Sequence, residues 1–293
     1  SGNVLVVGDS CGGVVNEAGI GKWDAFLVKY NAGGIRQGSK VFGSSEEDKA
    51  LGVALDSSSN AYITSYTKGD VVGANQGRED LLITKFNTDG NQQWIKQIGS
   101  PSQDYGHDIK VADSGNIYIV GGSRGSFDGN DCIERWNGDC SGDIIIIKYD
   151  SSGNKIWSKQ IGKSDREDAS GLALDSSENL YVAGYSNTPS IATDASGVQS
   201  AHGMFLAKFN SSGDQSWAVR FDPVYEGSLS QQIHEVALDS SGNIYVIGTS
   251  SAFEGETGLG GNDAFLLKSN SSGVKQWAKQ IGGSNYDGGR GIT

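Results

Sequence analysis

Acidic residues recur at two fixed places in this chain, and both places are candidates for cation binding. One set opens runs of apolar residues and consists of Asp24, Asp80, Asp143 and Asp263. The other set precedes runs of small residues and consists of Asp48, Asp104, Asp168 and Asp287. Carboxylates that converge from equivalent places, together with backbone carbonyls, are the ligands that Ca²⁺ prefers.

The alternative is structural, because a charge repeated in register usually caps a loop or pairs within its own unit. The first set is interpreted in this way. The second set has two interpretations: each side chain accepts hydrogen bonds from its own loop, or the carboxylates form an acidic rim that holds Ca²⁺. No D-x-D-x-D-G spacing is present, so Ca²⁺ is the weaker alternative and no other cofactor or metal is expected.

The segment 123–142 departs from the rest of the chain and carries Cys132 and Cys140 in the run CIERWNGDC. A local disulfide is expected, which indicates an oxidising compartment, since further zinc ligands are missing nearby. Cys11 is then left over, and we expect a buried thiol. Three further residues of the segment are candidates for contact with a protein or glycan: Arg124, Arg135 and Trp136. The alternative is a stabilised surface loop.

The elements that position these residues come from an internal repeat of about 60 residues. Its clearest register is DAFLVKY (24–30), DLLITKF (80–86), DIIIIKY (143–149), GMFLAKF (203–209) and DAFLLKS (263–269). A second register, of the type GLALDSSENLYVA (171–183), appears four times. Each unit divides into four short strands joined by Asp/Asn-Ser-Ser-Gly turns, which suit tight hairpins. No long helical periodicity is present, so an all-β fold is predicted.

A four-stranded unit of this size buries both faces of its sheet only by packing against further copies. We therefore predict one domain over residues 1–293, a five-bladed β-propeller of four-stranded antiparallel blades. One blade is split between residues 1–43 and 284–293, so that a C-terminal innermost strand (289–293) joins three N-terminal strands. Because the chain starts within a repeat, any leader is expected to have been removed.

A tryptophan occupies one position of the last strand in four units: Trp94, Trp157, Trp217 and Trp277. A large aromatic at a fixed site is expected to wedge between neighbouring sheets. The first unit has Gly38 there, and Leu5 in place of a tyrosine, so its packing must differ. Trp23 is expected to compensate.

The pattern GxALDSSGNxYVxGxS, a variable loop and DAFLxKYNSSGxxxWxKQIGG resembles the bacterial β-propeller repeat family SBBP, and is similar to NHL-type propeller repeats. The resemblance extends over nearly the whole chain. It implies a secreted or cell-surface protein of bacterial type, and it carries no catalytic motif.

Composition excludes several classes of function. The formal net charge of −12 and a sequence without basic runs argue against nucleic-acid binding. No apolar stretch is long enough for a membrane span. The single histidines His107 and His234 are expected to be ordinary polar residues.

The sequence therefore predicts a non-catalytic extracellular scaffold or binding module. Its variable loops lie on one face, where they contact protein or glycan. One alternative is a structural subunit of a cell-surface or extracellular assembly, or of a larger multi-domain protein. A second is a carbohydrate-active enzyme, which needs two unlike carboxylates in one cleft. Here the carboxylates recur in register, so no enzyme is expected.

Overall fold

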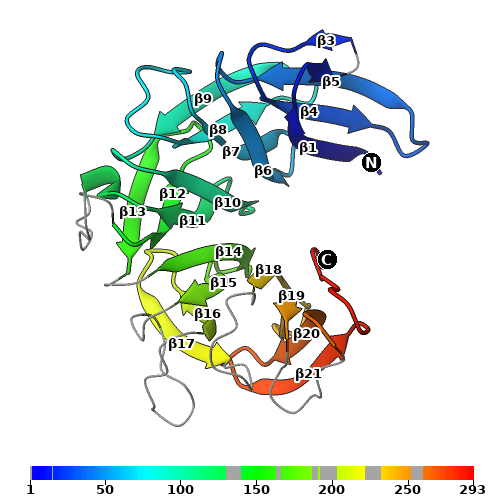
Figure 1. The fold of residues 1–293 in the computed structure, drawn as a ribbon, viewed down its shortest axis with the longest axis vertical. Coiled ribbons are helices and arrows are strands. Elements are labelled where there is room, and N and C mark those ends of the chain that lie inside the picture. The colour runs from blue at the N-terminus through cyan, green and yellow to red at the C-terminus, as the bar shows by residue number, and fades with distance from the viewer. Residues whose placement is uncertain are drawn as a thin grey trace. The chain divides into compact units, whose positions relative to one another are not determined.

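The computed structural model describes residues 2–14, 16–129, 140–162, 166–186, 191, 203–221, 232–251 and 260–293. Within these residues the chain forms β-strands and one 3-10 turn, η1 (Phe127–Gly129) (Figure 1). The predicted all-β fold is confirmed. The chain divides into two compact units, which we call the N-terminal unit (β1 to β11) and the C-terminal unit (β14 to β21). Their boundary falls within β12 (Asp143–Tyr149) and β13 (Lys155–Ile161).

Four sheets of the described chain have four strands in sequential antiparallel order, as the repeat predicts. The second sheet consists of β6 (Asp48–Leu55), β7 (Ala61–Thr67), β8 (Asp80–Phe86) and β9 (Gln92–Ile98). The third consists of β10 (Asp104–Val111), β11 (Ile117–Ser123), β12 and β13. The fourth consists of β14 (Glu167–Leu174), β15 (Leu180–Ser186), β16 (Gly203–Phe209) and β17 (Gln215–Phe221). The fifth consists of β18 (Gln232–Leu238), β19 (Ile244–Ser250), β20 (Asp263–Ser269) and β21 (Lys275–Ile281).

The first sheet has three strands in the order β1 (Val4–Ser10), β4 (Asp24–Tyr30) and β5 (Arg36–Phe42). A small hairpin of β2 (Gly13–Val14) and β3 (Glu17–Ala18) is inserted between β1 and β4. Residues 282–293 form no strand. The expected innermost strand at 289–293 is therefore not formed in the structure, and β1 lies at the edge of its sheet.

The turns explain why the repeat is rich in Asp, Ser and Asn. In the turn between β6 and β7, Asp56 Oδ1 accepts hydrogen bonds from the amides of Ser58 (3.0 Å) and Asn60 (2.9 Å). Asp56 Oδ2 accepts from the hydroxyl of Tyr62 at 3.2 Å. The aspartate therefore supplies the acceptors that a tight turn leaves missing in the backbone.

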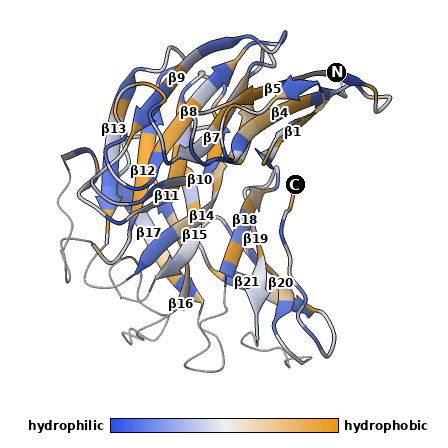
Figure 2. Cartoon of the chain, turned by 45° about the horizontal axis from the view of Figure 1, so that its top comes forward, coloured by the Kyte–Doolittle hydropathy of each residue, from blue (hydrophilic) through white to orange (hydrophobic). Residues whose placement is uncertain are grey.

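The middle strands carry the core. β8 is apolar over most of its length, as Figure 2 shows, and all but one of its residues are buried. In the N-terminal unit, Leu27 and Phe42 of the first sheet pack with Ile63 and Phe86 of the second. In the C-terminal unit, the corresponding cluster joins the fourth and fifth sheets. Within each unit, adjacent sheets thus bury apolar side chains against each other, as the repeat predicts.

In the second, third and fifth sheets, a glycine just after the last strand lies against a buried carboxylate. Asp80 is fully buried at the start of β8, where its Oδ2 accepts from Gln76 N and Gln97 Nε2, both at 2.9 Å. A Cβ added at Gly99, just after β9, would lie 2.2 Å from Asp80 Oδ1. Gly162 and Gly282 meet Asp143 and Asp263 in the same way. The predicted structural role of these aspartates is confirmed.

Replacing Gly99 with alanine is expected to destabilise the protein by about 1–3 kcal/mol, because the Asp80 carboxylate has to leave its hydrogen bonds. Gly38→Ala is the control, since a Cβ there meets nothing within 4 Å. Urea unfolding of both variants measures the difference. Equal stability of the two would contradict this role of Gly99.

Candidate functional site

Two of the predicted binding aspartates are buried caps of their own loops. Asp48 accepts from the amide and hydroxyl of Ser44 at 2.7 and 3.0 Å, and Asp104 accepts from the amide of Ser100 at 2.6 Å. Both side chains are fully buried. In the structure these two side chains cap their own loops and are not exposed at a rim.

Asp287 makes the same contact, because its Oδ2 accepts from the amide of Gly283 at 2.8 Å. Within the described part of the chain, no three His, Cys, Asp or Glu side chains converge as ligands for a metal ion.

Asp168 does not belong to this set. The cap lies opposite the last residue of the second strand, and in the fourth sheet that pair is Glu167 and Ser186. Asp168 is the next residue, half-exposed, with Arg166 Nη2 at 3.7 Å from its Oδ2. Counting back eight residues from the turn aspartate Asp175 finds Glu167, as the same count from Asp56 finds Asp48.

The residue after each cap points to the other face of its strand and differs between sheets. Lys49 pairs with Tyr66, Tyr105 with Gly122 and Asp168 with Tyr185. Side chains on successive strand positions alternate between faces. A buried acidic residue at this position therefore has a variable side chain beside it.

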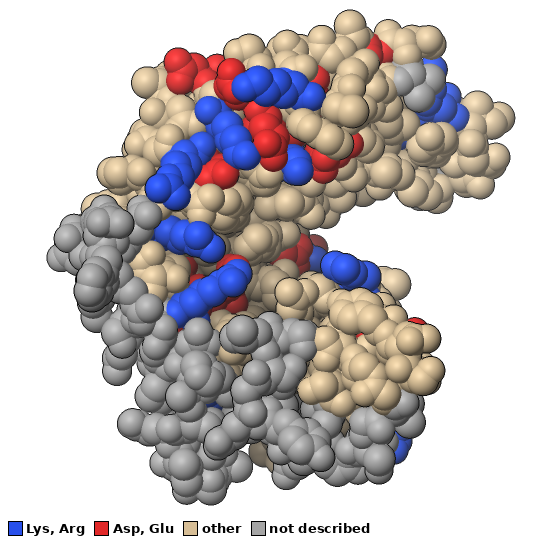
Figure 3. Space-filling view, in the orientation of Figure 1, with Lys and Arg blue, Asp and Glu red and all other residues tan. Residues whose placement is uncertain are grey.

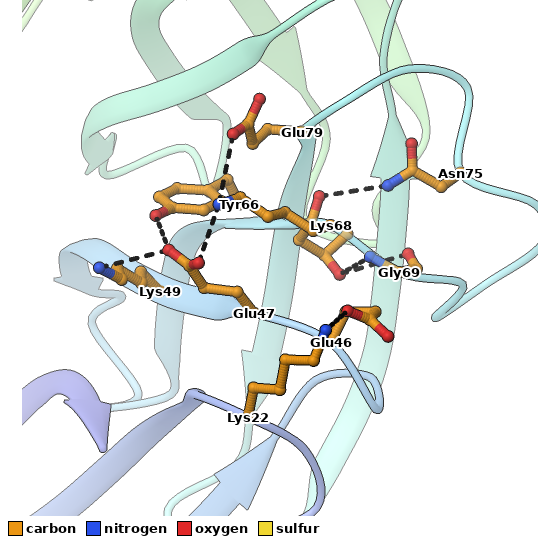
Figure 4. Close-up of polar contacts among 10 residues, drawn as sticks. Lys22, Glu46, Glu47, Lys49, Tyr66, Lys68, Gly69, Asn75 and Glu79 are labelled. Atoms are coloured by element: carbon orange, nitrogen blue, oxygen red, sulfur yellow. Dashed lines mark hydrogen bonds and ion pairs between the residues drawn. The ribbon is translucent and has the colours of Figure 1, made fainter. Parts of the chain in front are cut away.

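In the N-terminal unit these variable positions belong to a cluster that we call the loop-face cluster: Glu47, Lys49, Tyr66, Lys68, Glu79, Tyr105, His107 and Arg124. Glu47 is its centre, as Figure 4 shows. Its carboxylate accepts from Tyr66 Oη at 2.9 Å and from Lys68 Nζ at 2.8 Å, with Lys49 Nζ at 3.4 Å. Lys68 also lies 3.7 Å from Glu79 Oε1. Lys22 and Glu46 form a separate pair at 2.5 Å.

Two backbone pairings hold this cluster in place. Glu47 forms a parallel bridge with Trp23, and Glu79 forms one with Gln103. The hydroxyl of Thr67 accepts from the amide of Gly69 at 3.0 Å, which orders the loop that follows Lys68. The charged side chains therefore stand on the ends of strands and not on free loops.

The contacts shift the pKa values of the cluster. The hydrogen bond from Lys68 is the main cause that lowers the pKa of Glu47 to about 2. Burial, followed by the charge of Glu79, raises the pKa of Tyr105 to about 12. At neutral pH Glu47 is therefore ionised and Tyr105 is protonated.

Aromatic rings continue the cluster onto the third sheet. Tyr66 meets Tyr105 edge-on with centroids 5.2 Å apart, and Tyr105 stacks on His107 at 5.9 Å. Arg124, an exposed residue just after β11, contributes its charge to the surroundings of Tyr105. Arg124 was among the candidates from the sequence, but Tyr66 and Tyr105 were not. Tyr105 differs from the equivalent Lys49 and Asp168, whereas Tyr66 recurs as Tyr185 in the fourth sheet and so carries no such signal.

Basic and acidic side chains are interspersed over this face of the N-terminal unit in Figure 3. The cluster therefore presents both signs of charge together with tyrosine rings. Tyrosine and arginine are enriched in the residues that dominate protein interfaces. Such a surface suits recognition of a polar partner.

Several predicted residues remain untested. Trp136, Arg135 and Cys132 lie outside the described residues, so their predicted contacts and the Cys132–Cys140 disulfide stay predictions. Cys140 is buried, and its amide donates to Arg124 O at 2.8 Å. The expectation of a buried Cys11 is wrong, because this cysteine is exposed on the turn after β1. None of the described helical segments has the length and hydropathy to cross a membrane.

Repeated four-stranded antiparallel sheets, joined in order along the chain, define a propeller-repeat protein. The beta-propeller repeat family SBBP matches residues 93–128 and 156–189. The chain therefore carries repeats of this family, and the resemblance inferred from the sequence is confirmed.

Curated relatives match over part of the chain. The Regulatory protein FlaEY of Caulobacter vibrioides is 23% identical over 171 residues, which cover 57% of this chain and 18% of that protein. An uncharacterized WD repeat-containing protein of Acanthamoeba polyphaga mimivirus is 30% identical over 152 residues, 49% of this chain and 10% of that protein. The matched part of the chain thus spans less than a fifth of the length of either relative.

Similar solved structures include a protein of unknown function from Bacteroides caccae. Its TM-score is 0.49 at 11% identity, with 90% of this chain and 80% of that chain covered. A gluconolactonase from Xanthomonas campestris has a TM-score of 0.44 at 13% identity, with 90% of this chain and 74% of that chain covered. Both TM-scores are below 0.5, so the repeat sequence and the sheets themselves carry the fold assignment.

The buried cap Asp104 predicts a pH dependence of stability. Burial raises its pKa from 3.8 to about 6. The folded state then holds the proton more tightly than the unfolded state. This contribution is complete below pH 3.8 and is lost as the pH rises through about 6. Relative to Asp104→Asn, the wild type is expected to lose roughly 1–3 kcal/mol of unfolding free energy between about pH 4 and pH 6. Urea unfolding of both proteins across this range tests it, and a difference that stays flat or grows with pH would contradict it.

Proposed function

We propose that this chain is a non-catalytic extracellular binding module that engages protein or glycan through the loop-face cluster. The observation that carries the proposal is the cluster of Tyr66, Tyr105 and Arg124 beside the paired charges of Glu47 and Lys68. It lies on strand ends, where the repeats differ in sequence. The SBBP resemblance supports a location outside the cell, at a bacterial surface or in the medium.

A carbohydrate-active enzyme has less support. A glycosidase needs one carboxylic acid with a raised pKa beside an ionised carboxylate. In the cluster, Glu47 and Glu79 both flank the ammonium group of Lys68, and the pKa of Glu47 is lowered to about 2. Glu47 is therefore unsuited to donate a proton. The role of structural subunit has no specific observation in its favour.

Binding is tested with the separate variants Tyr105→Ala and Arg124→Ala. The probes are a glycan array and the proteins of a bacterial envelope fraction immobilised on a surface. Each variant is expected to lose about tenfold or more in affinity for the probe that the wild type binds, which is the usual effect of removing a central aromatic or arginine contact.

Ile35→Ala is the matched control, because this side chain is 65% exposed on the turn between β4 and β5, away from the cluster. It is expected to bind like the wild type, with all three variants melting at similar temperatures. Equal loss in the control and the cluster variants, or no loss in the latter, would overturn the loop-face assignment.

We further propose that the sheets close into one five-bladed ring through the C-terminal segment. Asp287 and Gly289 repeat the contacts of Asp104 and Gly106 at the start of β10. The amide of Asp287 donates to Asn262 O at 2.7 Å, as that of Asp104 donates to Glu79 O at 2.8 Å. Both acceptors immediately precede the third strand of a sheet.

The glycine two residues after each aspartate, Gly106 or Gly289, also has matching surroundings. A Cβ on Gly106 would meet Thr64 of the preceding sheet, and one on Gly289 would meet Ile247, which holds the same place in β19. The tail therefore lies where the first strand of a next sheet begins. At the other end of the chain, edge strand β1 leaves Val4 and Val6 exposed by 53% and 42%. The register of β10 against β11 then predicts that Ile292 pairs with Val6.

A disulfide tests this closure. In a Cys11→Ser background, Val6→Cys with Ile292→Cys is expected to form an intramolecular disulfide under mild oxidation, since directly opposed strand residues have Cα atoms about 4.5–5.5 Å apart. Val6→Cys with Gly291→Cys is the register control. Peptide mapping by mass spectrometry reads out the bond. Equal yields for both pairs, or only intermolecular bonds, would contradict the proposed register.

A further inference from the structure

The outer part of four sheets holds a repeated column of lysine, tyrosine and tryptophan. In the second sheet, Lys85 Nζ lies 4.9 Å above the ring of Tyr62, whose edge meets Trp94 at 6.0 Å. The same column occurs in the third, fourth and fifth sheets, at Tyr118, Tyr181 and Tyr245. It lies at the end of the sheets where the tight turns are, opposite to the loop-face cluster.

The tryptophans of the second and fourth sheets fill space against the following sheet. A Cβ on Gly153, in the turn between β12 and β13, would lie 3.1 Å from the indole of Trp94. Gly273, in the corresponding turn of the fifth sheet, meets Trp217 in the same way at 2.8 Å. The predicted wedge between sheets is confirmed for these two tryptophans.

The first sheet keeps the lysine of this column but lacks both rings, because it has Leu5 and Gly38 at their positions. A Cβ on Gly38 meets nothing within 4 Å. A pocket of about 580 Å³ lies here, between β5 and the turn residues 87–90 of the second sheet. Trp23 is not among its lining residues and is 40% exposed. The expectation that Trp23 compensates for the missing indole is therefore wrong.

The pocket has an apolar floor and a basic rim. Leu27 and Ala61 are buried and, with Leu5, belong to the core between the first two sheets. Lys29 and Lys40 line the rim, together with Arg36. Three basic side chains against two carboxylates, Glu17 and Asp89, line a pocket in a protein of net charge −12.

The contacts of Lys29 and Lys40 leave donors on both ammonium groups. Lys29 Nζ donates to Thr88 O at 2.9 Å, and Arg36 Nη1 donates to Ser39 Oγ at 3.0 Å. Lys40 Nζ lies 4.0 Å from Glu17 Oε1, with both side chains substantially exposed. A lysine held by a neutral carbonyl keeps donors for an incoming anion, since an ammonium group has three.

We propose that this pocket binds a small planar aromatic molecule that carries an anionic group. The ring takes the place that an indole fills between the other sheets, above Leu5 and Leu27. The anionic group lies at the rim, within reach of Lys29, Arg36 and Lys40. The missing indole leaves a space with the shape of a ring, and the basic rim gives the pocket its charge. A ligand therefore needs both a ring and an anionic group.

Indole-3-acetate is the probe, and indole and acetate are the controls that each lack one half of it. Isothermal titration and amide chemical shifts of the whole chain measure binding. Indole-3-acetate is expected to saturate and to shift the amides of Gly38 and Gly90. It should bind at least tenfold more tightly than indole, and acetate should not saturate.

Gly38→Trp restores the residue of the other repeats and is expected to abolish binding while the melting temperature stays equal or rises. If that variant melts below the wild type, Leu5→Tyr fills the same pocket from β1 and takes its place. Lys40→Gln is expected to lower the affinity for indole-3-acetate by threefold or more and to leave the affinity for indole unchanged. Lys96→Gln is its matched control, because Lys96 holds the same place in β9, outside the pocket.

Three outcomes would each overturn the proposal. The first is no saturable binding of indole-3-acetate at millimolar concentration. The second is unchanged binding by a folded variant that fills the pocket. The third is an equal effect of Lys40→Gln and Lys96→Gln. None of them bears on the loop-face cluster, whose variants lie at the opposite end of the sheets.

Discussion

A buried carboxylate that closes a loop is the interaction on which the sheets of this protein depend. Asp48 and Asp104 each accept from the amide four residues earlier, and Asp80 accepts from the backbone amide of Gln76 and the side-chain amide of Gln97. Burying a charge without such partners is costly, so each aspartate fixes the path of the chain into its strand. Gly99 completes the arrangement, because only a residue without a side chain fits beside the Asp80 carboxylate.

This constraint separates structural from variable positions along the same strand. The cap faces inward, and its neighbour, such as Lys49 or Tyr105, faces the other way and is free to differ. The loop-face cluster arises from such neighbours on two adjacent sheets. Its lysine and glutamate side chains pair with one another. The cluster therefore presents tyrosine rings and an arginine beside charges that are held in place.

The residues that depart from the sequence repeat have different effects at the two ends of the sheets. At the loop end, substitutions add side chains that contact one another. At the turn end of the first sheet, Gly38 and Leu5 remove two rings, and what remains is a pocket with the basic residues of the column still in place. Loss of a packing residue from one repeat thus creates a site without any new motif.

The amino-acid sequence alone was enough to define most of the strands and turns, because these follow from apolar alternation and Asp/Asn-Ser-Gly chemistry within a few residues. The run DLLITKF, for example, is β8 from its first residue to its last. It also indicated that the first unit packs differently, since Gly38 and Leu5 break the pattern.

The contacts of each acidic side chain, and the space left where a side chain is absent, follow from how the strands pack. Glu167 and not Asp168 stands at the position of the caps, because it pairs with Ser186 of β15. Trp23 lies at the wrong end of its strand to replace an indole at Gly38. Both outcomes depend on the register between strands within a sheet, which the residue types alone do not give.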